Sequence, residues 1–189
     1  MELDDSDLIN DYQNGNQGAF ETLVSRYLKT VYVFIFRLVG RPSESEDLTQ
    51  DTFVKIWKNL DKYDKEKSFK TWVLSIAKNT TYDWFRKKKA INFSEINQQM
   101  PENNFGDNIP DVELLPDEIF EQKELAAFLS SALDKITLDL RTILILHLED
   151  GLTFEEIAQI VKKPMNTVKS QYRRALLILR KYLVENAPN

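Results

Sequence analysis

The chain has 189 residues, of which 42% are hydrophobic and 29% are charged, and it contains no cysteine and one histidine. This composition is typical of a folded protein with one domain or two small ones, and it excludes disulfides, thiolate zinc sites and cysteine nucleophiles. The formal net charge of −5 argues against a nucleic-acid-binding protein, but the charged residues lie in blocks that decide more than their sum.

The N-terminal part of the chain is acidic and then helical. Residues 2–21 hold six acids and no base, and the pair Asp4 and Asp5 is expected in an N-terminal tail. Apolar residues recur over 19–39 with the 3.6-residue period of a helix. Gly40 is expected to end this helix.

Two further helices and a basic segment follow. Ser43 and Glu46 have the spacing of a capping box, which predicts a helix start at Ser43. A charged loop over 61–67 precedes a third helix at about 68–89. Residues 62–89 hold nine bases against three acids, so this helix is predicted to be cationic.

The middle of the chain is expected to be a linker. From about 91 to 116 the helical period disappears and Asn, Gln, Pro and acids dominate. Residues 90–122 hold eight acids and no base. Such a segment is either a solvated tether or an acidic mimic of RNA. Helical periodicity returns at about Asp117.

The last third of the chain has the pattern of a helix-turn-helix over 152–180. A helix predicted at 138–149 comes first. Thr153 and Glu156 then form a second capping box, Pro164 breaks the short helix, and Asn166 is a candidate cap of the last one. Residues 160–184 hold seven bases and no acid.

The last helix has one apolar and one polar face. Its polar face is made of side chains that can read base edges and phosphates in a DNA major groove; these are Lys169, Ser170, Gln171, Arg173 and Arg174. The alternative is that this polar face is simply a solvated basic face in a helical bundle. The preceding short helix and breaker favour DNA binding.

Other functional classes lack their signals. No apolar run approaches the roughly 20 residues of a membrane-spanning helix, so we expect no membrane insertion. The N-terminus lacks the pattern of a signal peptide, so we expect a cytoplasmic location. His147 lies in an apolar helix without partner residues, and we expect it to be packed. No catalytic residue, metal, cofactor or small-molecule substrate is expected.

Several segments resemble one family, the bacterial sigma factors of the sigma-70 family. Residues 152–161 and 166–175 resemble its C-terminal promoter-binding domain. Residues 47–57 resemble the helix that docks on the clamp coiled coil of RNA polymerase, and 69–89 resemble the promoter-melting helix. Because no folded domain separates the two halves, the chain is identified as a member of the compact extracytoplasmic-function (ECF) group.

The resemblance implies roles for particular residues. Contact with core RNA polymerase would be made by Asp47, Gln50, Asp51, Phe53, Lys55 and Trp57. Contact with the minus-10 element, including a base flipped out of the duplex, would be made by Tyr63, Ser68, Phe69, Trp72, Asn79, Asp83, Arg86, Lys87 and Lys88. Contact with the minus-35 element would be made by Thr167, Lys169, Ser170, Gln171, Arg173 and Arg174.

The basic segment supports the minus-10 assignment independently. Six aromatic residues alternate there with the lysines and arginines; they are Tyr63, Phe69, Trp72, Tyr82, Trp84 and Phe85. Single-stranded DNA is held by aromatic stacking together with a cationic track. The alternative is that Trp72 is simply part of the core and the lysines are simply solvated.

The sequence thus predicts an all-α protein of two small helical domains joined by a flexible acidic linker. Domain 2 of the family would span 1–91, the linker 92–122, and domain 4 with its helix-turn-helix 123–189. The chain would be a non-catalytic subunit that directs core RNA polymerase to promoter DNA and is controlled by an anti-sigma factor. The alternative is a stand-alone helix-turn-helix regulator, which leaves the aromatic and basic segment unexplained.

Overall fold

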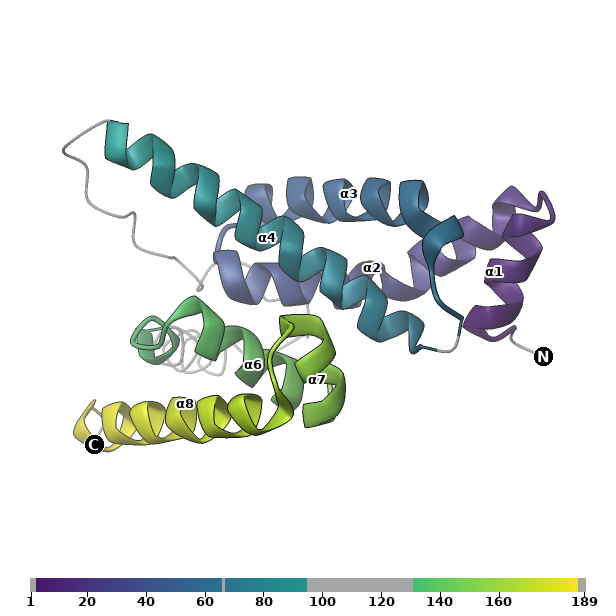
Figure 1. The fold of residues 1–189 in the computed structure, drawn as a ribbon. Helices are drawn as coiled ribbons and strands as arrows, with labels where there is room; N and C mark the ends of the chain where they lie inside the picture. The colour runs from purple at the N-terminus through teal and green to yellow at the C-terminus, as the bar shows by residue number, and fades with distance from the viewer. Residues whose placement is uncertain (1–2, 66, 95–130, 187–189) are drawn as a thin grey trace, which may run out of the picture.

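The chain is built from helices and their connections. The structure, a computed structural model, describes residues 3–65, 67–94 and 131–186, and no strand occurs in these ranges. Figure 1 shows two groups of helices: α1 (Asp5–Gln13), α2 (Gln17–Val39), α3 (Pro42–Asn59), the short 3-10 helix η1 (Leu60–Lys62) and α4 (Phe69–Ser94), then α6 (Leu138–Leu148), α7 (Phe154–Val161) and α8 (Met165–Asn186). The all-α prediction with a C-terminal helix-turn-helix is confirmed.

The predicted linker falls almost entirely outside the described residues. Of residues 92–122, only 92–94 are described, and they belong to the last turn of α4. The helical pattern predicted from Asp117 onward also lies outside the described residues until 131.

The prediction of an N-terminal tail at Asp4 and Asp5 is wrong. The carboxylate of Asp4 accepts a hydrogen bond from the backbone N–H of Asp7 at 2.8 Å and so caps α1. Asp5 lies in the first turn, where it pairs with Arg26 of α2 at 2.5 Å. Leu8 and Ile9 are buried, so burial of two apolar side chains outweighs the acidic composition of the segment.

The capping box predicted at Ser43 is also wrong. Helix α3 begins at Pro42, with Arg41 as its N-cap residue and no side-chain cap. Proline suits the first helical position because its missing N–H would have no partner there. Arg41 instead pairs with Glu44 at 3.0 Å.

Of the two helix starts predicted for the helix-turn-helix, the start of α7 is confirmed and the start of α8 is wrong. The capping box of Thr153 and Glu156 is present in both directions, so its prediction is confirmed. Asn166 does not cap α8, because the helix already begins at Met165. The carbonyl of Pro164 accepts the first helical hydrogen bonds, from the N–H groups of Thr167 at 2.9 Å and Val168 at 3.1 Å.

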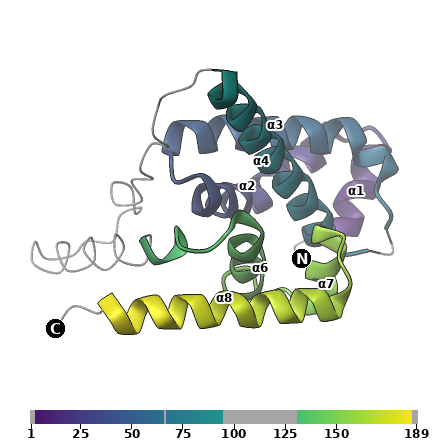
Figure 2. The same ribbon diagram turned by 60° about the vertical axis from the view of Figure 1, so that its left-hand side comes forward.

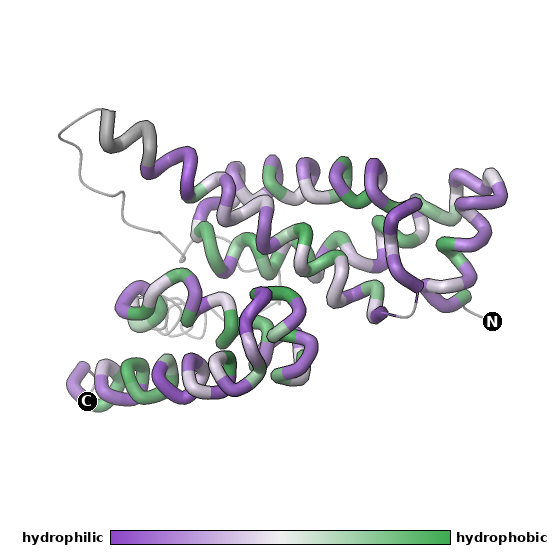
Figure 3. The backbone as a smooth tube through the Cα atoms, in the orientation of Figure 1, coloured by the Kyte–Doolittle hydropathy of each residue, from purple (hydrophilic) through white to green (hydrophobic). Residues whose placement is uncertain are grey.

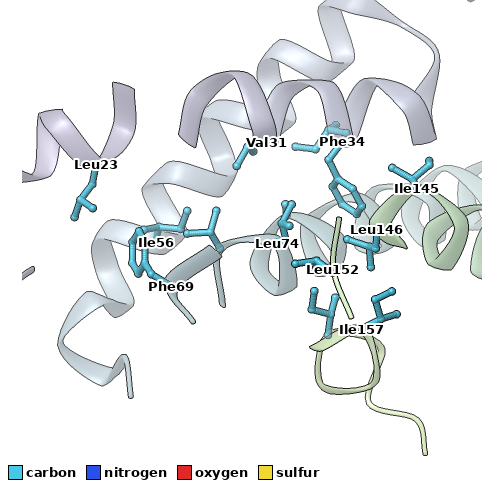
Figure 4. Close-up of a cluster of buried hydrophobic side chains, with 14 of the residues drawn as sticks. Leu23, Val31, Phe34, Ile56, Phe69, Leu74, Ile145, Leu146, Leu152 and Ile157 are labelled. Carbon is cyan, nitrogen blue, oxygen red and sulfur yellow. The ribbon is translucent and has the colours of Figure 1, made fainter. Parts of the chain in front are cut away.

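One hydrophobic core joins the two groups of helices. It includes Phe34 and Leu74 from the first group and Leu146, Leu152 and Ile157 from the second, all of them buried. In Figure 4 the ring of Phe34 points from α2 toward Leu146 of α6. In Figure 3 hydrophobic residues gather along α2, while hydrophilic residues form the connection that leads into α4.

The two groups therefore lie directly against each other. Helix α6 packs beside α2, and α7 packs beside α4. Figures 1 and 2, which view the molecule 60° apart, both show α7 next to the first turns of α4 and α8 on the far side of α6. The outer faces of α3, α4 and α8 remain available for partners.

Candidate polymerase and promoter interfaces

The outer face of α3 combines acidic and apolar side chains. Asp47, Gln50 and Asp51 are exposed. Trp57 is 52% exposed, and Val54, which lies between Asp51 and Trp57 on the same face of the helix, is 47% exposed. A tryptophan this exposed is common in protein interfaces and unusual elsewhere on a surface. Val54 was missed by sequence reasoning, although its spacing of three from both Asp51 and Trp57 places it on the same face.

Two of the residues predicted to contact polymerase point inward instead. Phe53 packs against the hydrophobic core. The ammonium group of Lys55 donates to the hydroxyl of Thr80 on α4 at 2.9 Å. In this structure both side chains hold α3 against its neighbours rather than extending its outer face.

The start of α4 is built on a cluster of aromatic rings. Tyr63 and Phe69 are buried, with ring centroids 5.2 Å apart. Trp72 lies half-buried on both, at 5.2 Å from Tyr63 and 5.6 Å from Phe69. The hydroxyl of Tyr63 donates to the carbonyl of Lys67 and fixes the loop. Exposed Ser68 accepts a hydrogen bond from the N–H of Thr71 at 3.4 Å.

The outward face of α4 carries the remaining predicted minus-10 residues. Trp72, Asn79, Asp83 and Arg86 are separated by seven, four and three residues, which places them on one side of the helix. Asn79 and Arg86 are exposed. Arg86 pairs with Asp83 at 2.9 Å, and Lys78 donates to the amide oxygen of Asn79 at 3.2 Å. The face is thus polar and cationic beside one large aromatic ring.

The end of α4 adds cations but few free aromatic rings. Lys87 is exposed, and the ammonium group of Lys88 lies 4.6 Å from the ring centroid of Trp84. Trp84 and Phe85 pack partly against the core. Of the three aromatic residues predicted to contact the minus-10 element, Tyr63 and Phe69 are buried and Trp72 is half-buried on the outward face of α4.

Two consecutive lysines shape the turn of the helix-turn-helix. Lys162 adopts a left-handed backbone with φ of 53°. The ammonium group of Lys163 then reaches Asp139 at the start of α6, at 2.5 Å, and the amide oxygen of Gln171 on α8, at 3.4 Å. The hydrogen bond from Lys163 is the main cause that lowers the pKa of Asp139. This bridge sets how α8 leaves the turn.

The outer face of α8 presents the predicted minus-35 residues. Thr167, Ser170, Arg173 and Arg174 are exposed, and they are flanked by half-buried Lys169 and Gln171. Val168 and Ala175 are fully buried on the opposite side. Gln171 and Arg174 also line a cavity of about 470 Å³ between α8 and the start of α6. All six residues therefore lie on or beside one helix surface.

His147 is packed, as predicted. Its ring stacks on Phe154 with centroids 4.4 Å apart and contacts Tyr172 edge-on at 4.8 Å. Its Nδ1 is 2.8 Å from the carbonyl oxygen of Leu152. Within the described ranges, no three metal-ligating side chains come together. None of the helices described in the structure could cross a bilayer.

Asp150 should make stability depend on pH. Burial raises the pKa of its carboxyl to about 6, the charge of Glu149 raises it further and Lys70 opposes the shift. Because this pKa lies above the ordinary carboxyl value, the native state gains stability from protonation, and this gain is lost as pH rises from about 4 through 6. We expect Asp150→Asn to raise the melting temperature at pH 7. The decrease in melting temperature between pH 4 and 7 should be smaller in this variant than in the parent chain. The control is Asp61→Asn, on the exposed surface, which should match the parent chain; equal curves for all three proteins would contradict the assignment.

Comparisons with known proteins agree with this arrangement. The sigma-70 region 2 family model matches residues 23–91, and the sigma-70 region 4 model matches residues 129–179. The ECF RNA polymerase sigma factor SigX of Bacillus subtilis is 32% identical over 168 residues, covering 87% of this chain and 84% of SigX. SigW of the same organism is 30% identical and covers 97% and 98% of the two chains.

Solved structures give the same result. The sigma factor RpoE of Bartonella quintana, in complex with the anti-sigma factor NepR, matches with a TM-score of 0.72 and 25% identity, covering 87% of this chain and 96% of RpoE. CnrH in complex with the cytosolic domain of CnrY matches in fold, with a TM-score of 0.69, 22% identity and coverage of 95% and 97%.

Proposed function

The chain belongs to the ECF group of the sigma-70 family, whose members are non-catalytic subunits that give RNA polymerase its promoter specificity, and we propose that it does so by recognising two promoter elements with separate helices. In this proposal α3 binds core polymerase, α4 opens and holds the minus-10 element, and α8 reads the minus-35 element as duplex. The main support for this proposal is that α3, α4 and α8 present three outward faces of different chemistry on one chain.

The outer face of α4 suits a strand that has left the duplex. Unstacking a base costs a few kcal/mol, which a protein recovers by stacking and by charge. Trp72 offers an aromatic surface, Asn79 offers an amide that can hydrogen-bond a base edge, and Arg86 and Lys87 offer charges for phosphates. Tyr63 and Phe69 would support this surface from beneath, since both are buried.

The outer face of α8 suits duplex DNA. Helix α8 begins at Met165, so Thr167 and Ser170 lie in its first turns, where backbone N–H groups and hydroxyls can meet phosphates. Arg173 and Arg174 follow on the same exposed side, and arginine is the side chain that most often reads guanine in the major groove.

Binding assays with and without polymerase test this proposal against a stand-alone regulator. A gel shift is run on promoter DNA with the chain alone, with core polymerase alone and with both. We expect a sequence-specific complex only when both are present. Specific binding by the chain alone to a palindromic site would instead support the regulator.

Arg174→Ala is expected to weaken use of the minus-35 element. Loss of a bidentate contact to a base costs about 1–3 kcal/mol, or roughly a 5- to 150-fold loss of affinity for promoters that carry the element. Affinity is measured by titrating the holoenzyme on promoters with intact and scrambled minus-35 sequences. Arg180→Ala, exposed further along α8, is the matched control and should lose little. Equal use of both promoters by the Arg174 variant would remove it from the interface.

Asn79→Ala is expected to slow promoter opening more than promoter binding. The amide would contact a base only after the strand separates, so its loss affects the later step. Closed-complex affinity and the rate of strand opening are measured separately, by gel shift at low temperature and by fluorescence of 2-aminopurine at the minus-10 element. Asn186→Ala, at the end of α8, should change neither. A defect in binding with normal opening would contradict the assignment.

The chain would consist of two domains and a linker. We propose domain 2 over 1–91 and domain 4 over 123–189, joined by an acidic linker, and the matched ranges 23–91 and 129–179 support these limits.

Because RpoE is bound by an anti-sigma factor, we propose such a partner here too. The apolar side chains exposed on α8 offer a surface for it; they are Leu176, Leu177 and Val184. The place of action would be the cytoplasm.

A further inference from the structure

Lys163 lies in the turn between α7 and α8, and its ammonium group has two partners on two other helices. It pairs with one carboxylate oxygen of Asp139, at the start of α6, at 2.5 Å. It also donates to the amide oxygen of Gln171 on α8, in a longer hydrogen bond of 3.4 Å. The ammonium group therefore lies between a carboxylate and an amide oxygen, and both of these oxygens face it.

The pair of Lys163 and Asp139 is partly shielded from water. The side chain of Lys163 is 30% exposed and that of Asp139 is 47% exposed, so the pair keeps more of its attraction than one in open solvent. The hydrogen bond from Lys163 is the main cause that lowers the pKa of Asp139, so the carboxylate stays charged at neutral pH. Asp139 thus anchors the ammonium group beside Gln171.

Gln171 lies on the part of α8 that is proposed to face DNA. Thr167, Ser170, Gln171 and Arg174 have the spacing of residues that share one stripe of a helix. Gln171 is half-buried, and together with Arg174 and Asp139 it lines the cavity of about 470 Å³ beside α8. The cavity gives the amide space in which to turn, so its orientation depends on the polar groups around it.

The ammonium group of Lys163 decides which end of the amide faces inward. A glutamine amide accepts hydrogen bonds through its oxygen and donates them through its NH₂ group, whereas an ammonium group can only donate. The oxygen of Gln171 is therefore drawn toward Lys163, and its NH₂ group is directed away. In this orientation the amide offers only donors to a base.

A donor-only glutamine reads bases differently from a free one. A free glutamine pairs with adenine through both ends of its amide, donating to N7 and accepting from the N6 amino group. With the oxygen of Gln171 held by Lys163, the second of these bonds is lost. The bases that offer acceptors without an amino group in the major groove are guanine, through N7 and O6, and thymine, through O4.

We propose that Lys163 is a positioning residue that sets base preference in the minus-35 element. By holding the oxygen of Gln171, it would make this side chain read guanine or thymine in preference to adenine or cytosine. The inference rests on the proposed function, because it requires that α8 reads the minus-35 element as duplex. The effect falls on a single base pair, which distinguishes it from a lysine that only stabilises the turn or attracts phosphates.

Transcription from a promoter library tests this role with the reconstituted holoenzyme. The minus-35 element is randomised, and transcripts are counted by sequencing for the parent chain and each variant. The position that faces Gln171 is identified as the one whose base preference Gln171→Ala removes. Lys163→Met keeps the length of the side chain but removes its charge, and Lys163→Arg keeps the charge. Lys162→Met, at the exposed neighbouring position, is the matched control for charge.

We expect the parent chain to prefer guanine or thymine at this position. In Lys163→Met the carboxylate of Asp139 should attract the NH₂ group of Gln171 and turn its oxygen outward. The preference should then move toward adenine or cytosine by about fivefold or more, the lower end for one base-reading contact. Lys163→Arg and Lys162→Met should keep the parent preference. In a Gln171→Ala background, Lys163→Met should have no further effect at this position.

Three results would overturn the inference: a parent preference for adenine or cytosine, an unchanged preference in Lys163→Met, or an equal loss across all library sequences in that variant. Melting temperatures within a few degrees of the parent chain would show that the variants fold. A parent chain that directs transcription without any preference in the minus-35 element would refute the proposed role of α8 and the inference with it. A clear preference that Lys163→Met leaves unchanged would refute the inference alone, so the two failures are distinguishable.

Discussion

Trp57→Ala is expected to weaken the complex with core RNA polymerase by about 30-fold, which corresponds to about 2 kcal/mol. The ring of Trp57 is 52% exposed on the outer face of α3, beside the acidic and amide side chains of Asp47, Gln50 and Asp51. A large ring that contributes little to the free protein and is buried on association is the usual centre of an interface. The affinity is measured by competition for core polymerase against a labelled housekeeping sigma factor.

The same variant should fold normally, which separates a binding defect from a folding defect. Leu148→Ala is the matched control, because Leu148 is 56% exposed but lies at the end of α6. We expect the melting temperatures of both variants to stay within a few degrees of the parent chain and only Trp57→Ala to lose affinity. Equal affinity of both variants for core polymerase would show that α3 does not dock through this face.

Phe34→Ala is expected to destabilise the whole chain by about 3–5 kcal/mol. Phe34 is 1% exposed, and its ring fills the space between α2 and α6 (Figure 4). Because it belongs to the core shared by both groups of helices, the loss should lower the stability of α6–α8 as well as that of α1–α4. Unfolding in urea is followed by tryptophan fluorescence and by far-ultraviolet circular dichroism.

The matched control for this variant lies on the same helix. Leu28 is 48% exposed, so Leu28→Ala should cost no more than about 0.5 kcal/mol. The three tryptophans, Trp57, Trp72 and Trp84, report only on the first group of helices. If fluorescence showed the full loss while dichroism retained a second, unchanged transition, the core would not be shared in solution.

Helix positions could be predicted well from the sequence, and helix ends less well. The apolar period placed α2 and the helix-turn-helix, because burial on one side of a helix leaves a 3.6-residue pattern. The start of α3 was misplaced because two signals competed, and Pro42 at the first helical position prevailed over the Ser43 capping pattern. Helix α1 was missed because its two buried residues, Leu8 and Ile9, are too few to show a period among acids.

At the candidate sites, positions along a single helix could be predicted from the sequence, whereas contacts between helices could not. Spacing along one helix is enough to place Asn79 and Arg86 on the same face. It could not tell that Lys55 turns toward Thr80 of α4, since that depends on how two helices pack. The contact between Tyr82 and Asp139, which are 57 residues apart, leaves no pattern in the sequence at all. Long-range contacts of this kind follow from the three-dimensional fold alone.

Reconstituted run-off transcription is the most direct test of whether this chain acts as the promoter-specificity subunit of RNA polymerase. Core polymerase is incubated with genomic promoter fragments, with or without the chain, and transcript 5′ ends are mapped. We expect discrete start sites that appear only with the chain, share two upstream sequence elements and weaken with the Trp57→Ala variant. Transcript patterns that are identical with and without the chain would show that the chain does not direct RNA polymerase to promoters.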